Sequence, residues 1–100
     1  MAPGVTLASR VRVPDSTAAR QVDTETVLLN LESGIYFGLD EIGTRMWQLI
    51  ARGTPLAEAR SALLDEYEVE PERLESDLIH LVEELAGHGL VVVDPGGGAA

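Results

Sequence analysis

The chain has 100 residues, the size of one small domain, and its 45% hydrophobic content is enough for one compact core. Seven arginines and no lysine stand against 17 acidic residues, and the net charge of −10 argues against nucleic acid or an anionic membrane as a partner and favours a basic or apolar one. Without cysteine there are no disulfides and no thiolate chemistry, and no signal peptide or membrane-spanning run is visible, so a cytoplasmic protein is expected.

The first predicted element is an edge strand over residues 5–13, where apolar and polar residues partly alternate. Residues 14–16, Pro-Asp-Ser, are turn-forming and end it. A loop to about Thr24 is expected to follow, with room for a short pairing near residues 20–22.

The strongest strand signal is a hairpin, made of two β-rich runs at 25–32 and 35–39 around a Ser-Gly pair. With a two-residue loop, Leu31 faces Tyr36 and Leu29 faces Gly38. A longer loop would swap the faces, and the sequence leaves both registers open. Both faces of the hairpin carry apolar residues, and Tyr36 and Phe37 must point to opposite sides. We interpret this apolar excess as a sign of a binding surface.

Three helices are predicted after the hairpin. The first is capped by Asp40 and runs from Glu41 to about residue 52, with Trp47 in the core. Thr54 is expected to cap the second, with Pro55 at its first position. The third is expected from residue 71 to about residue 86. Residues 90–93 then read as a short extended piece, and 95–100 as a flexible tail after a single domain over residues 1–94.

The third helix carries more apolar surface than one core contact needs. Two neighbouring stripes run along it, one of Leu74, Leu78, Leu81 and Leu85 and one of Ile79, Val82 and Ala86. Carboxylates flank both stripes. We therefore expect one stripe to pack inward and the other to line a groove.

No catalytic or metal-binding pattern is present. The two histidines, His80 and His88, are eight residues apart, whereas a helical metal pair favours a spacing of four. No serine lies in a nucleophile elbow, and the glycines form no phosphate-binding loop. The sequence thus predicts neither an enzyme nor a cofactor.

The run from Val27 to Trp47, VLLNLESGIYFGLDEIGTRMW, closely resembles the PqqD-like proteins, and among them the stand-alone precursor-recognition proteins of lasso-peptide biosynthesis. The similarity extends over about residues 5–93. It implies an α+β fold like a winged helix-turn-helix, with a three-stranded antiparallel sheet followed by three helices. Members of this family are non-catalytic, carry no cofactor and act as recognition elements for ribosomally synthesised and modified peptides (RiPPs).

The resemblance implies that the leader segment of a precursor peptide adds as an antiparallel strand to the third strand of the sheet, beside the third helix. The leader is then presented to a leader peptidase. Strand addition supplies main-chain hydrogen bonds, and alternate side chains supply specificity. The expected peptide-binding residues are Gly34, Ile35, Tyr36, Phe37 and Gly38 on the strand and Leu74, Glu75, Asp77, Leu78, Ile79, Leu81 and Val82 on the helix.

Three alternatives stay open, and one of them is a small structural subunit with no peptide ligand. A winged-helix DNA-binding regulator shares the fold outline, although the third helix carries only Arg73 among many carboxylates. The pyrroloquinoline quinone branch of the same family shares the fold as well, and a shared fold does not choose between pathways.

Overall fold

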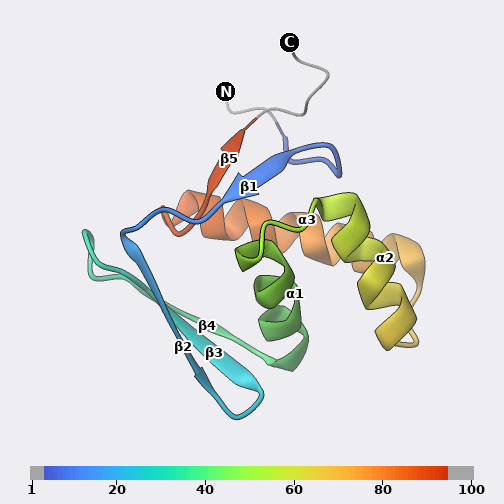
Figure 1. Cartoon of the computed structure of the whole chain (residues 1–100), viewed down its shortest axis with the longest axis horizontal. Helices are drawn as coiled ribbons and strands as arrows, with labels where there is room; N and C mark the ends of the chain where they lie inside the picture. Colours follow the sequence, from blue (N-terminus) through green and yellow to red (C-terminus); the bar gives the residue numbers. More distant parts are fainter. Residues whose placement is uncertain (1–3, 95–100) are drawn as a thin grey trace.

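The computed structural model describes residues 4–94, which form five strands and three helices (Figure 1). In chain order these are β1 (Arg10–Arg12), β2 (Thr17–Val22), β3 (Glu25–Asn30), β4 (Tyr36–Leu39), α1 (Glu41–Ala51), α2 (Leu56–Glu66), α3 (Pro71–Gly87) and β5 (Val92–Asp94). β2, β3 and β4 pair antiparallel in that order, and three helices follow. The expected α+β fold is confirmed, while the predicted tail 95–100 lies outside the described residues.

The identity of the first sheet strand differs from the prediction. The sheet begins with β2, and the predicted strand over 5–13 is reduced to β1, which pairs antiparallel with β5 in a separate two-stranded sheet. Five of the six residues of β2 are exposed, so β2 lacks the alternating pattern by which a strand is recognised. Its pairing with β3 over its whole length, which is not visible in the local sequence, makes it a strand.

The hairpin uses the longer of the two loops considered. Leu29 lies opposite Tyr36, and Leu28 lies opposite Phe37. Relative to the two-residue loop the register has moved by two residues, which is a full pleat. The faces are therefore not exchanged: Leu28 remains on the buried face and Tyr36 on the exposed one.

The helices begin and end close to the predicted residues, with one correction. The Asp40 carboxylate caps α1 by accepting from the Gly43 N–H at 2.8 Å. Thr54 does not cap α2; Pro55 occupies that position. The Thr54 N–H instead donates to the Leu49 carbonyl at 3.1 Å, so this residue completes the end of α1.

The core lies between the sheet and the helices. Trp47 of α1 is 6% exposed and packs with buried residues of β3, α3 and the segment before β5, which confirms its predicted core position. A second cluster joins α1, α2 and α3. In Figure 1, α1 stands between the sheet and α2, and α3 passes behind it. Within residues 4–94, no helix has the length and apolar character needed to cross a membrane.

An ion pair links α1 to α2. The Arg45 Nε and Nη2 atoms donate to the two Glu66 carboxylate oxygens at 2.8 Å each. This hydrogen bonding lowers the pKa of Glu66 below its ordinary value and raises the pKa of Arg45. A lowered carboxyl pKa contributes stability above the unfolded-state pKa of about 4.3, and that stability is lost as the pH falls through the folded-state pKa.

We therefore expect Glu66→Gln to reduce stability at pH 7 by about 0.5 kcal/mol, a value kept small because the Glu66 side chain is 36% exposed and solvent screens the pair. The loss corresponds to about 2–4 °C in Tm. Thermal unfolding of both proteins at pH 7 and pH 3 measures it, with the exposed Glu68→Gln as control. A wild-type advantage that persists undiminished at pH 3 would contradict this role for the pair.

Candidate functional site

β4 forms one edge of the three-stranded sheet. The Asn30 N–H donates to the Ile35 carbonyl at 2.9 Å, which fixes the phase of the β3–β4 ladder. Because ladder bonds in an antiparallel pair fall on every second residue, Phe37 is the next residue bonded to β3. The main-chain groups of Tyr36 and Gly38 consequently point away from β3. At this edge the sheet thus offers the N–H and C=O groups of two residues, Tyr36 and Gly38, for pairing with another strand.

The C-terminal half of α3 lies beside this edge. Phe37, on the inner face of β4, packs in the same cluster as Leu81, and its ring centroid is 5.4 Å from that of His88. Asp77 and Glu84 are four residues before and three residues after Leu81, so they share its side of the helix, and both are exposed. The edge of β4 therefore borders a helix face that is apolar at Leu81 and acidic on both sides of it.

Asn30 fixes the hairpin to the end of α3. Its side chain is buried, its Nδ2 donates to the His88 carbonyl at 3.0 Å, and its Oδ1 accepts from the N–H groups of Glu32 and Ser33 at 2.9 and 3.1 Å. Gly89, with φ +71°, leaves the room that Asn30 needs, since a Cβ at residue 89 would lie 2.9 Å from Nδ2. The distance between the hairpin and the end of α3 is thus set by part-buried hydrogen bonds rather than by a free loop.

The predicted strand residues lie together at the edge. Tyr36 is 69% exposed, Ile35 and Gly38 are exposed, and Phe37 is half-buried. Gly34 has φ +77° and donates its N–H to the Asn30 carbonyl at 2.7 Å. The hairpin turn accounts for this glycine without any ligand, because a left-handed backbone favours glycine.

The predicted helix residues divide into separate groups. Leu74, Leu78 and Val82 are 0–3% exposed and lie inside the core, so they do not reach the surface. Glu75 faces α2, where its Oε1 is 2.9 Å from the Arg60 Nε. These four residues are therefore not available to a peptide bound at β4.

Ile79 also lies apart from the edge. It is two residues from Leu81, which places it about 160° away around the helix axis. Of the seven helix residues predicted, Leu81 packs in the same cluster as Phe37 of β4, and Asp77 shares the side of Leu81 by its helical spacing. The two stripes do not separate cleanly into an inward one and a groove-lining one. Leu74, Leu78 and Leu85 of the first stripe are buried, and so is Val82 of the second, while Leu81 is half-buried.

Glu84 and His88 were missed by the sequence reasoning. Both share the side of Leu81, at spacings of three and seven residues, and this helical spacing is the signal that could have found them. Among residues 4–94, no group of three or more histidines and carboxylates is placed to hold a metal ion. What this arrangement can do chemically is to pair main-chain groups and to contact apolar and basic side chains.

Comparisons with known proteins point to one family and one fold. The model of the family described as coenzyme PQQ synthesis protein D (PqqD) matches residues 25–91. One similar solved structure is TbiB1 in complex with the TbiA(beta) leader peptide, at 36% identity and a TM-score of 0.76, covering 80% of this chain and 93% of that one. Another is lasso peptide synthetase B1 complexed with the leader peptide, at 30% identity and a TM-score of 0.75, covering 82% and 96%. Among curated proteins, none matches this sequence.

Proposed function

Because this chain belongs to the PqqD family, we propose that it binds the leader segment of a ribosomally synthesised precursor peptide and delivers it to a leader peptidase in lasso-peptide biosynthesis. The observation that carries the proposal is the free edge of β4, with the unpaired main-chain groups of Tyr36 and Gly38 next to the acidic and apolar side of α3. Two relatives of 36% and 30% identity, each solved with a leader peptide, support it.

The leader adds to β4 as an antiparallel fourth strand. Its main chain pairs with Tyr36 and Gly38, which gives affinity without regard to sequence. Its alternate side chains point to the side of α3, where Leu81 takes an apolar residue and the carboxylates of Asp77 and Glu84 take lysine or arginine. Side chains of the leader on the other face meet the exposed Tyr36 ring.

The protein acts as a carrier and not as a catalyst. A free leader is disordered, so ordering it on β4 costs about 2–5 kcal/mol of the interaction free energy, and moderate affinity is expected. Moderate affinity suits a carrier because the leader must be released once the peptidase has cut it.

Two other functions are less well supported. In a winged-helix DNA regulator the outward side of the recognition helix is basic, but here the exposed side of α3 carries Asp77, Glu83 and Glu84 with Arg73 alone. A role in pyrroloquinoline quinone synthesis is consistent with the family description. The two solved relatives with leader peptides, one of them a lasso peptide synthetase component, favour the lasso pathway.

A titration tests the proposal. A fluorescently labelled leader peptide from a lasso precursor of the same pathway is titrated with the protein, and anisotropy is recorded at low and high salt. We expect saturable binding that weakens moderately with salt, because Asp77 and Glu84 are exposed and screened. A labelled DNA duplex serves as the competing ligand. Binding of the duplex without binding of the leader would overturn the proposal.

A further inference from the structure

The sheet has a second free edge, at β2. The Leu31 N–H donates to the Ser16 carbonyl at 2.7 Å, which fixes the phase of the β2–β3 ladder. The same alternation then directs the main-chain groups of Ala19 and Gln21 away from β3. Their side chains lie on the inner face, because Ala19 is opposite Leu28, which is fully buried. A strand added here would place the residue opposite Ala19 on this inner face.

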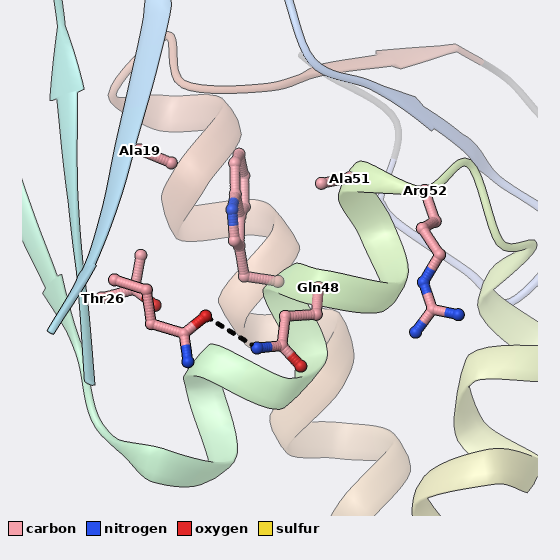
Figure 2. Close-up of a pocket in the computed structure, with 7 residues that line it drawn as sticks. Ala19, Thr26, Gln48, Ala51 and Arg52 are labelled. Carbon is pink, nitrogen blue, oxygen red and sulfur yellow. Dashed lines mark hydrogen bonds between the residues drawn. The ribbon is translucent and has the colours of Figure 1, made fainter. Parts of the chain in front are cut away.

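A pocket of about 430 Å³ opens beside this edge, between β2 and the end of α1 (Figure 2). It is lined by Ala19, Gln21, Thr26, Trp47, Gln48, Ala51 and Arg52. Figure 2 shows Ala19 and Ala51 on opposite sides of it, with Gln48 below them and Arg52 beyond the helix. The small alanines leave the space, and Trp47 supplies an apolar surface. The pocket can take one large apolar side chain.

Two polar features of the pocket have a bearing on its occupant. The Thr26 side chain is buried, with 3% of the residue exposed, and its Oγ1 has no hydrogen-bond partner. Such a group is costly unless a partner satisfies it. Across the floor, the Gln48 Nε2 donates to the Gln21 Oε1 at 2.9 Å, which joins β2 to α1 at the lower end of the pocket.

Two arginines, Arg20 and Arg52, lie near the middle of this edge, and two carboxylates, Asp23 and Glu25, lie at the turn that follows β2. No carboxylate of residues 4–94 lies within 4.0 Å of the guanidinium groups of Arg20 and Arg52. Arg52 lines the pocket, whereas Arg20, opposite the exposed Val27, lies on the outer face of the sheet at the same edge. In a chain of net charge −10, these two arginines favour a partner segment that carries carboxylates. A second copy of this chain suits these arginines less well, since neither of its free edge strands, β2 or β4, carries a carboxylate.

We propose that β2 and this pocket are the docking site for the leader peptidase, which adds an extended segment of its own to β2. An apolar side chain of that segment, opposite Ala19, fills the pocket over Trp47, and flanking carboxylates pair with Arg20 and Arg52. The choice of the peptidase as partner rests on the proposed function. Because β2 and β4 are about 10 Å apart, at opposite edges of one sheet, leader and peptidase can be bound at the same time.

The test uses the single tryptophan of the chain. The full chain is labelled with 5-fluorotryptophan, so that one ¹⁹F resonance reports on Trp47, and is titrated first with the leader peptide and then with the purified peptidase. We expect the peptidase, which covers the pocket over Trp47, to shift the resonance more than the leader does, since the leader reaches Trp47 only through the cluster that also holds Phe37. A resonance that peptidase binding leaves in place would overturn the proposal.

Variants provide the second readout. Ala19→Pro removes an outward N–H, and Arg52→Glu reverses a charge at the pocket. Each variant is expected to weaken peptidase binding at least tenfold while its leader affinity stays within twofold of wild type. The retained leader affinity also shows that the variant is folded. Arg10→Glu, an exposed charge reversal on β1, is the matched control and is expected to change neither. Unchanged peptidase affinity in both pocket variants would overturn the proposal, as would a wild-type dimer that Ala19→Pro dissociates. Failure of the leader to bind wild type would instead contradict the proposed function. The peptidase affinities of the variants would still test the docking site at β2.

Discussion

Tyr36→Pro is expected to weaken leader binding by about 10–100-fold. Proline removes the N–H that Tyr36 directs to the free edge, and the leader carbonyl that it would pair with is left unsatisfied, at a cost of about 1–3 kcal/mol. Tyr36 is the first residue of β4, a position where strands accept proline, and its N–H makes no ladder bond to β3. The fold should therefore be retained.

The experiment is a leader titration of Tyr36→Pro, Tyr36→Ala and Ala19→Pro, with circular dichroism as the check on folding. Tyr36→Ala keeps the N–H and removes only the ring, so it separates side-chain from main-chain contributions. Ala19→Pro makes the same change at the other edge of the sheet and should bind the leader like wild type. Equal losses of leader affinity in the two proline variants, or a loss in Ala19→Pro alone, would contradict binding of the leader at β4.

Leu78→Ala is expected to reduce the free energy of unfolding by about 2–5 kcal/mol, because Leu78 is 0% exposed in the cluster that joins α1, α2 and α3. Its effect on the leader affinity of the folded protein should be small. Leu81→Ser should behave in the opposite way. Leu81 is half-buried at the side of β4, so its substitution should reduce the free energy of unfolding by less than Leu78→Ala does. It should lower the affinity for the leader by about 5–20-fold, because apolar contact with the leader is lost.

Urea unfolding and leader titration of the two variants, at a temperature where both are folded, give the comparison. Val82→Ala is a further core control, since Val82 is also fully buried. If Leu78→Ala lowered leader affinity as strongly as Leu81→Ser in folded protein, the division of α3 into a core side and a binding side would be wrong.

The elements with strong local signals were predictable. Asp40, Gly34 and the apolar run of β3 mark a helix start, a turn and a buried strand by chemistry that acts over a few residues. β2 was not predictable in this way, because its exposed sequence gains a partner only when β3 is in place. The pairing of β1 with β5 joins segments about 80 residues apart, for which the local pattern holds no information.

The candidate site could be predicted at β4 more fully than on α3. The hairpin and the similarity of residues 27–47 to a known family located Tyr36, Phe37 and Gly38 without the structure. The rotation of α3 about its axis decides which stripe is inward, and a helix that is apolar on more than one side leaves that rotation undetermined. Packing against α2 and β4 selects it, which put Val82 in the core and gave Glu84 and His88 to the site.

The central claim is that the leader becomes a strand on β4, and amide hydrogen exchange tests it most directly. The N–H groups of Tyr36 and Gly38 have no ladder partner in the free protein, so they should exchange fast, while that of Phe37 is already protected. Saturating leader should slow exchange at Tyr36 and Gly38 at least tenfold and leave Ala19 and Gln21 unchanged. Unchanged fast exchange at both Tyr36 and Gly38 with the leader fully bound would contradict the account.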